Sequence, residues 1–276
     1  PEGDAGTGMI ATNSIRPNTG NVSAGTSVFA MIVLDRPLSA VHPEIDLVLT
    51  PDGHPVAMAH SNNCSSDLDA WMAVLAEAAT AMGAEAEMPA VFARLLPLGL
   101  QGEPDAGGLV AVPYVSGEHL TGFSEGRPML VRSSGARFTL ANLVRAHLYG
   151  AIAAMRSGLD ILTEREGISI AAITGHGGFF KTAEVGQRVM AAATGARCTV
   201  LETAGEGGAW GMALLAAYMV AAEPGQALAD FLDSVFASAQ SSTVEASPGD
   251  VAGYTAYLKR YRAALSAERA AVEALD

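Results

Sequence analysis

Two strand–turn–helix units follow one another in residues 168–211, which read ISIAAITGHGGFFKTAEVGQRVMAAATGARCTVLETAGEGGAWG. The first unit begins with the apolar segment 168–173, whose Ile and Ala side chains predict a buried strand. The glycine-rich segment 175–178 predicts a turn, and residues 179–194 predict a helix. Glycine at such a turn lets the backbone approach a ligand closely, and the helix that follows exposes its first N–H groups.

The second unit repeats this order. Residues 198–201 predict another buried strand, residues 205–208 a glycine-rich turn and residues 209–222 a helix. Because each turn presents helix N–H groups to a ligand, two of them in succession favour a nucleotide. The sequence therefore indicates a nucleotide-binding α/β protein and leaves open which nucleotide-binding architecture it has.

The rest of the chain predicts a β-rich start followed mainly by helices. The expected strands lie at 28–34, 45–49 and 56–59, and the expected helices at 67–82, 138–162, 227–237 and 251–275. Thr139 is the expected N-cap of the long helix. Along the last helix Tyr254, Tyr257 and Tyr261 recur at spacings of three and four, which predicts a packing stripe. Residues 84–137 contain five prolines, which break regular structure, so we expect this segment to be irregular. The chain has no internal repeat and no linker, so one domain of residues 1–276 is the simplest interpretation.

Composition and charge exclude several classes of protein. The chain is 50% hydrophobic and 16% charged, which is typical of a globular protein. Its formal net charge of −13, with the basic residues scattered, argues against nucleic acid as a partner. No apolar run reaches the roughly 18 residues that span a bilayer, so we expect no membrane segment. Cys64 and Cys198 are too few for a disulfide framework and are expected to be reduced packing residues in a cytoplasmic protein.

Three patterns resemble known sites without matching them. Residues 175–182 approach the P-loop pattern, but Phe180 replaces its second glycine and would clash with phosphates. Residues 205–211 approach a dinucleotide fingerprint, but the strand that should end in an acidic residue about 20 positions later is missing. His60 and Cys64 are two isolated candidate ligands, so we expect no metal site there.

Five short motifs occur in the order and with the separations of a known family. They are Gly3-Asp4, residues 25–27 (GTS), residues 113–118 (PYVSGE), residues 175–178 (GHGG) and residues 207–211 (GGAWG). Each motif is weak alone, but together they resemble the C-terminal half of the FGGY carbohydrate kinases over essentially the whole chain. The resemblance implies the ribonuclease H-like superfold of actin, Hsp70 and sugar kinases, with this chain as its C-terminal half. Because the chain starts without Met, we expect it to be part of a longer protein.

The resemblance implies that Asp4 is the catalytic base of a phosphoryl transfer. A carboxylate can orient a sugar hydroxyl and take its proton as the bond to phosphorus forms. An alternative interpretation is that Asp4 caps a helix beginning at Ala5. Residues 4–7 (DAGT) also imitate the first phosphate loop of this superfold, but the next phosphate motif follows too closely, so we do not assign that role.

The resemblance further implies an ATP site made of three glycine-containing turns. The residues implied are Gly25, Thr26 and Ser27 on the phosphates, Gly175, Gly177 and Gly178 along the adenosine, and Gly207 and Gly208 beside it. Without the family context the first turn is unremarkable, and the last two glycines could equally serve close helix packing. Where the family often has Ser or Asn, this chain has Ala183, which leaves Lys181 and Thr182 as candidate replacements. We expect His176 to support its turn.

The loop of residues 113–118 departs from the family pattern because His119 stands where Arg is usual. We therefore interpret this loop as structural, with Glu118 paired inside the domain.

The implied activity is ATP-dependent phosphorylation of a sugar, with Mg²⁺ as cofactor. Residues 20–27 and 62–64 most resemble the ketopentose kinases, ribulokinase or xylulokinase. The absent N-terminal half would carry the first phosphate loop and most sugar contacts, so we expect this fragment alone to be inactive. The apolar last helix could pack on a partner domain or in a homodimer. The alternative is a non-catalytic module of the same superfold that senses a nucleotide or a sugar.

Overall fold

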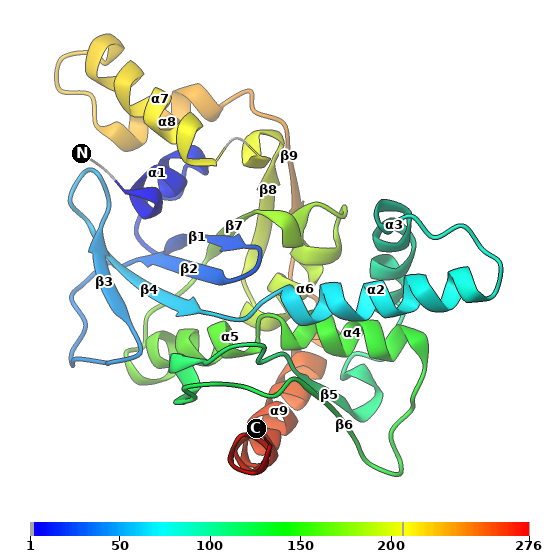
Figure 1. The fold of residues 1–276 in the computed structure, drawn as a ribbon. Coiled ribbons are helices and arrows are strands. Elements are labelled where there is room, and N and C mark those ends of the chain that lie inside the picture. Colours follow the sequence, from blue (N-terminus) through cyan, green and yellow to red (C-terminus); the bar gives the residue numbers. More distant parts are fainter. Residues whose placement is uncertain (1–2, 206, 276) are drawn as a thin grey trace.

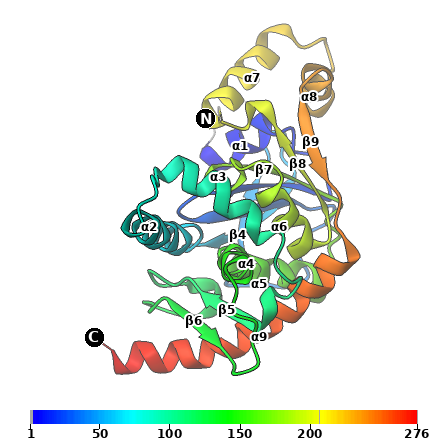
Figure 2. The same cartoon turned by 90° about the vertical axis from the view of Figure 1, so that its right-hand side faces the viewer.

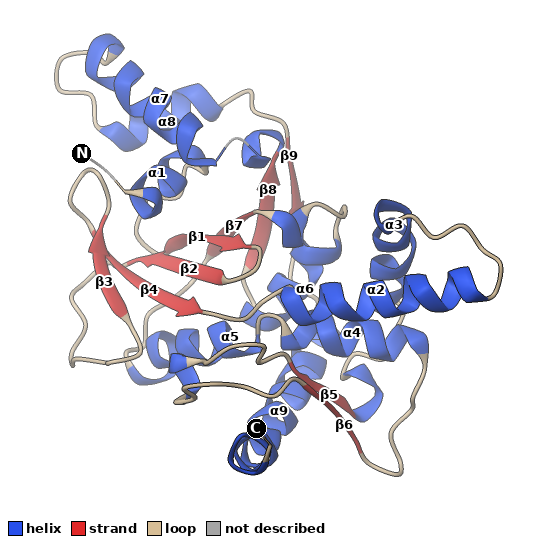
Figure 3. Ribbon diagram, in the orientation of Figure 1, coloured by secondary structure: helices blue, strands red, loops and turns tan. Residues whose placement is uncertain are grey.

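The computed structural model of the chain describes residues 3–205 and 207–275. Its strands are β1 (Thr19–Ala24), β2 (Val28–Val33), β3 (Asp46–Leu49), β4 (Pro55–Ser61), β5 (Leu109–Val112), β6 (Met129–Arg132), β7 (Ala172–His176), β8 (Arg197–Leu201) and β9 (Ser241–Val244). Its α-helices are α1 (Asp4–Ala11), α2 (Ser66–Ala81), α3 (Met88–Gly99), α4 (Leu140–Gly150), α5 (Ala153–Asp160), α6 (Val185–Thr194), α7 (Gly207–Ala221), α8 (Leu228–Phe236) and α9 (Pro248–Ala274). Figure 3 shows how the two kinds of element are distributed.

Within the described residues, seven strands form one mixed sheet in the order β3-β4-β2-β1-β7-β8-β9. The central strands β1, β7 and β8 run parallel, whereas β2, β3, β4 and β9 pair antiparallel with their neighbours. The carboxyl ends of the three parallel strands therefore meet at one edge of the sheet. β5 and β6 form a separate antiparallel pair.

Side chains that alternate along each strand divide the core between the two faces of the sheet. In β2, Ala30 and Ile32 belong to the larger cluster, which includes residues of α4, α5, α6 and α9. Met31 and Val33 point to the other face, where they pack with Met9 and other residues of α1, α7 and α8. Figure 1 shows these two groups of helices on opposite sides of the sheet.

The last helix is anchored by the tyrosines that its spacing predicted. Tyr254, Tyr257 and Tyr261 are all buried. The Tyr257 hydroxyl lies 3.1 Å from the carbonyl oxygen of Ala111 in β5, and the Tyr261 hydroxyl donates to that of Tyr114 over 2.7 Å. The packing stripe on this helix is therefore confirmed.

The expectation of an irregular segment over residues 84–137 is wrong, because α3, β5 and β6 lie within it. Pro89 occupies the first turn of α3, where its missing N–H would have no partner in the helix. Pro97 lies only in the last turn, and the burial of Val91 and Leu96 holds the helix in place. β9 (residues 241–244) is likewise absent from the strands expected from the sequence.

The single long helix expected over residues 138–162 is two helices. Thr139 caps α4 as predicted, because its side chain accepts a hydrogen bond from the Asn142 N–H. The chain leaves helical geometry at Ile152, where φ is −117° and ψ is 5°. The break follows Gly150, which lies so close to the Ala111 carbonyl in β5 that a side chain there would collide with it. No helix in the described ranges has both the length and the apolar character to cross a membrane.

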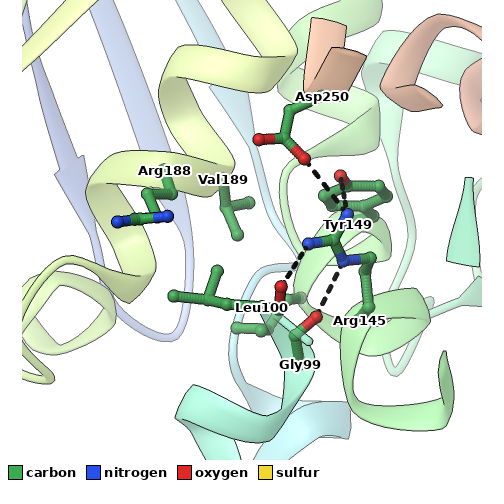
Figure 4. A pocket seen from close by; sticks show the side chains of 8 residues that line it. Gly99, Leu100, Arg145, Tyr149, Arg188, Val189 and Asp250 are labelled. Atoms are coloured by element: carbon green, nitrogen blue, oxygen red, sulfur yellow. Dashed lines mark hydrogen bonds and ion pairs between the residues drawn. The ribbon is translucent and has the colours of Figure 1, made fainter. Parts of the chain in front are cut away.

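The buried side chain of Arg145 joins α3 and α4 to the start of α9 (Figure 4). Its Nε donates to the Gly99 carbonyl over 2.7 Å and its Nη2 to the Leu100 carbonyl over 3.0 Å. Its Nη1 lies 3.3 Å from Oδ1 of Asp250. A cation at the carboxyl end of α3 also complements the helix dipole. The surrounding pocket has a volume of about 20 Å³, so it holds no more than a water molecule.

We predict that Arg145→Met lowers the free energy of unfolding by about 2–4 kcal/mol, because two backbone carbonyls and a carboxylate lose their donor. Urea denaturation measures this. The control is Arg94→Met, which removes an exposed arginine of α3 and should change stability by less than about 0.5 kcal/mol. Equal stability of the two variants would contradict the role given to Arg145.

A second group of hydrogen bonds joins residues 36–42 to the segment before β7. Glu166 Oε2 accepts the Ser39 N–H over 2.7 Å, and Oε1 lies 2.6 Å from Nε2 of His42. Arg36 donates to the Glu166 carbonyl over 2.6 Å. These hydrogen bonds, first from Ser39 and then from His42, lower the pKa of Glu166 to about 2.

We predict that Glu166 makes the fold sensitive to acid. A carboxylate with a depressed pKa contributes its full stabilisation above its ordinary pKa of 4.5 and loses it as the pH falls toward 2. Glu166→Gln should therefore reduce the drop in the free energy of unfolding between pH 5 and pH 3, relative to the parent protein. The exposed Glu85→Gln is the control and should leave the pH dependence unchanged. Parallel pH profiles for Glu166→Gln and the parent would refute this prediction.

Candidate functional site

The glycine-containing turns meet where the three parallel strands end. β1 leads into the hairpin of residues 25–27, β7 into Gly177 and Gly178, and β8 into the start of α7 at Gly207. Ser23 in β1 lies opposite His176 in β7, so the first two turns are direct neighbours. The structure thus brings together three turns that lie far apart in the sequence, at residues 25–27, 177–178 and 207.

The hairpin between β1 and β2 is held by the beginning of α2. The Gly25 N–H donates to the Ser27 carbonyl over 2.9 Å. The Gly25 and Thr26 carbonyls accept hydrogen bonds of 3.0 Å from the Ser65 and Cys64 N–H groups. These hydrogen bonds to the residues just before α2 fix the orientation of the hairpin. The Thr26 side chain is exposed.

The first strand–turn–helix unit is shifted from its predicted position. β7 covers residues 172–176, so Gly175 lies in the strand and the turn begins at Gly177. A side chain at Gly175 would collide with the buried ring of Phe180. Phe180 therefore packs into the core and cannot belong to a P-loop, as expected. The predicted helix over 179–194 is also divided, because Glu184, with φ of 63°, separates a short turn from α6.

The glycines differ in what surrounds them. Added Cβ atoms at Gly25, Gly178 and Gly207 would meet no atom within 4 Å, so these three face open space. Gly177 instead lies close against the Ala24 carbonyl and has a φ of 96°, which favours glycine. Gly208 is also a packing residue, since its added Cβ would be 3.0 Å from Oγ1 of Thr7.

Two of the open glycines, Gly178 and Gly207, border a pocket of about 420 Å³, within the range of small-molecule sites. Its lining residues are His176, Gly177, Gly178, Phe180, Lys181, Val200 and Gly207. Lys181, one of the two candidate replacements for the family's polar residue, is exposed and supplies a positive charge there. Val200 was not singled out from the sequence, because a strand valine carries no signal of such a role.

Burial lowers the pKa of His176, which favours the neutral imidazole. Its Nε2 lies 3.4 Å from Nδ2 of the buried Asn21 in β1. This cross-strand contact agrees with the expectation that His176 supports its turn.

α1 packs directly on α7, near the glycine pocket. Gly208 and Gly211 of α7 lie against Thr7 of α1, and Gly8 lies beside Asn21 and His176. Asp4 is the first residue of α1, one turn before Thr7, but its side chain lies outside the described residues. Gly3 occupies the N-cap position, so the alternative interpretation of Asp4 as the cap is wrong.

The Glu118 loop is structural, as predicted. Glu118 is completely buried. Its Oε2 accepts hydrogen bonds from the Ser61 hydroxyl over 2.7 Å and from the Asn63 amide over 3.1 Å. The Asn62 amide donates to the Gly117 carbonyl over 2.9 Å, so the asparagine-rich segment holds this loop. His119 Nδ1 lies 3.9 Å from Oε1 of Glu118.

A stacked aromatic pair extends the same face of the sheet beyond the pocket. Phe29 in β2 lies opposite both Ser23 in β1 and His60 in β4. The Phe29 and His60 rings stack with centroids 4.2 Å apart. Burial and, secondarily, the neighbouring His119 lower the pKa of His60. The sequence did not predict that Phe29 and His60 stack, because only the register of the strands places these side chains together.

Cys64 is buried, which raises the pKa of its thiol. Among the residues that the structure describes, no group of three or more His, Cys, Asp or Glu side chains is arranged to hold a metal ion.

We predict that the same substitution has unequal effects at two glycines of this site. Gly175→Ala should lower the free energy of unfolding by about 1–3 kcal/mol, because the added methyl group forces the Phe180 ring to move. Gly178→Ala should change it by less than about 0.5 kcal/mol, because the space there is open. Thermal or urea unfolding of both variants gives the comparison, and an equal loss would show that the two glycines do not differ.

The structure is similar to solved sugar kinase structures. It matches xylulose kinase from Rhodospirillum rubrum with a TM-score of 0.73 and 19% identity, over 95% of this chain and 49% of that chain. For glycerol kinase from Plasmodium falciparum, solved with ADP, the TM-score is 0.74 and the identity 14%, over 96% and 50%. For gluconate kinase from Lactobacillus acidophilus the values are 0.72 and 18%, over 96% and 50%.

These likenesses show the superfold shared by actin, Hsp70 and the sugar kinases, and the chain spans about half the length of the solved structures that it matches. No curated protein sequence matches the chain. The model of the C-terminal domain of the FGGY family of carbohydrate kinases matches residues 20–220. The chain therefore belongs to the FGGY family of carbohydrate kinases, in which it corresponds to the C-terminal domain.

Proposed function

We propose that the complete protein transfers the γ-phosphoryl group of MgATP to a hydroxyl of a sugar, and that this chain supplies the ATP site and the catalytic base. The sugar-binding half, with the first phosphate loop, would lie in the part of the protein that precedes this chain. The two cysteines are free and buried, which supports a reducing location such as the cytoplasm.

The observation that carries the proposal is the open arrangement of Gly25, Gly178 and Gly207 around one end of the sheet. Backbone without side chains can approach phosphates and a purine closely, and α7 begins at this edge with its N-terminus. Lys181 provides a positive charge beside the same pocket. The open glycines, the N-terminus of α7 and Lys181 together fit a nucleotide, and Mg²⁺ would bind with its phosphates.

Asp4 is the proposed base because it begins α1, the helix that packs on α7 beside this pocket. A carboxylate in that position would orient the attacking hydroxyl and accept its proton, while the glycine turns hold the nucleotide. Positioning and charge stabilisation supply most of the acceleration in phosphoryl transfer, so this division of roles is sufficient.

The proposed acceptor is a ketopentose, L-ribulose or xylulose. Xylulose kinases are among the similar structures, but so are a glycerol kinase and a gluconate kinase. The choice therefore rests on the resemblance of residues 20–27 and 62–64 to the ketopentose kinases. A panel of pentuloses and polyols, tested with MgATP on the complete enzyme, identifies the acceptor by its kcat/KM.

The ATP site is tested by binding, which does not require the sugar. Gly178→Val should weaken MgATP binding by at least roughly tenfold in calorimetry, because its side chain would fill the space that faces the pocket. Gly135→Val is the matched control, since Gly135 also faces open space but lies outside this pocket. Undiminished ATP binding by Gly178→Val would mean that the nucleotide binds elsewhere.

The catalytic role is tested separately in the complete protein. Asp4→Asn should lower kcat by roughly 10²–10⁴-fold, the usual contribution of a general base, and should leave ATP binding intact. Turnover that survives this substitution would contradict the assignment of Asp4 as the base. Loss of both turnover and ATP binding would indicate a structural role instead.

A further inference from the structure

A second pocket, of about 350 Å³, lies between α5, α6 and α9. α6 ends at Thr194, shortly before β8 begins at Arg197, so this pocket lies at the edge where the parallel strands start. The glycine pocket lies at the opposite edge, where the same strands end. Figure 2 shows α9 passing below α5 on this side of the molecule. We call this second site the α5–α9 pocket.

One buried carboxylate in this pocket serves two arginines. Asp160 forms ion pairs with Arg156 through Oδ1 and with Arg262 through Oδ2. The contact with Arg156 lacks the geometry of a hydrogen bond. The side chain of Asp160 is only 8% exposed, whereas those of Arg156 and Arg262 are 18% and 44% exposed. Asp160 therefore forms ion pairs with both guanidinium groups that line the pocket, and the charge of Glu164 also acts on Arg156.

The arginines are held in place rather than free to move away. Arg156 Nε donates to the Ala193 carbonyl at the end of α6 over 2.6 Å. Arg262 is fixed by its hydrogen bond to Asp160. Burial lowers the pKa of Arg262, and the nearby charge of Arg156 lowers it further. An anion that bridged the two guanidinium groups would relieve this repulsion.

Lys259 adds a third positive charge to the α5–α9 pocket, one turn before Arg262 on α9. In the described part of the chain, no carboxylate forms an ion pair with it. Glu164 lines the pocket as well, so three cations face two carboxylates. This local excess of positive charge is unusual in a chain whose net charge is −13. The chain has only two lysines, Lys181 and Lys259, and each of them lines a pocket.

The remaining lining suits a ligand with a phosphate and an organic part. Thr194 and Thr255 also line the pocket, but their hydroxyls donate to the Met190 and Val251 carbonyls over 2.8 Å, so the donors for a phosphate are the three cations. Val251, Tyr254 and Leu258 provide an apolar wall from α9. Guanidinium groups match phosphate oxygens with paired N–H donors, and a dianion satisfies two of them better than a single carboxylate does.

We propose that the α5–α9 pocket binds the phosphate group of a small phosphorylated molecule. Arg156 and Arg262 hold the phosphate oxygens between them, Lys259 adds charge at the entrance, and the apolar wall of α9 receives the organic part. This site is separate from the proposed ATP site and does not depend on that proposal.

The test is calorimetric titration of the protein at low ionic strength with inorganic phosphate, glucose 6-phosphate and glucose. Lys259→Gln and Arg262→Gln should each weaken phosphate binding by roughly tenfold, as expected for loss of one charged donor. Glucose should not bind. Tighter binding of glucose 6-phosphate than of inorganic phosphate would identify a phosphate ester as the ligand, and the reverse order would identify free phosphate.

Two control variants remove the same charge elsewhere. These variants are Arg94→Gln and Lys181→Gln. Arg94 lies on the exposed surface of α3, and Lys181 lines the glycine pocket. Both should change phosphate affinity by less than about twofold. Equal weakening in all variants would indicate general electrostatic attraction, and weakening only in Lys181→Gln would place the phosphate in the glycine pocket. Either result, or absence of binding to the parent protein, overturns the proposal. Because Lys259 is exposed and forms no ion pair among the described residues, its replacement should leave thermal unfolding unchanged and keep the comparison valid.

Discussion

The parallel pairing of β1 with β7 and of β7 with β8 is the constraint on which the rest of the structure depends. It places the carboxyl ends of three strands at one edge of the sheet, although the chain between β1 and β7 includes four helices and both strands of the small sheet. Each strand ends in a turn that contains glycine. The pocket exists because the turns after β7 and β8 become neighbours, and neither turn alone encloses it.

The crowding of the core decides which glycines remain available to a ligand. The ring of Phe180 fills the space beside Gly175, the backbone of β1 fills the space beside Gly177, and α1 fills the space beside Gly208. Gly25, Gly178 and Gly207 are left open. The same sequence signal therefore covers two physical roles. Packing glycines let strands and helices approach one another, and open glycines leave room for a ligand.

The two pockets of the α/β core use opposite ends of the sheet and different chemistry. The glycine pocket offers backbone and one lysine, which suits a ligand held mainly through close approach. The α5–α9 pocket offers fixed guanidinium groups on a shared carboxylate, which suits an anion held mainly through charge. Helices α5, α6 and α9, which build the second pocket, also cover one face of the sheet. Both sites thus rely on the same packed layer.

The sequence alone determined the α/β class, the family, the three turns, the Thr139 cap and the tyrosine stripe of α9, because periodicity and local motifs act over a few residues. It also indicated correctly that Phe180 excludes a P-loop and that Glu118 is structural. It did not predict α3, because we took its prolines as helix breakers although the first and last turns of a helix tolerate proline. It also did not predict the break at Ile152 or the start of β7 at residue 172. Those features depend on contacts with distant segments. Only the tertiary structure separated open from packed glycines and joined Arg156 of α5 to Arg262 of α9, because strand register and helix packing bring together residues that no local pattern connects.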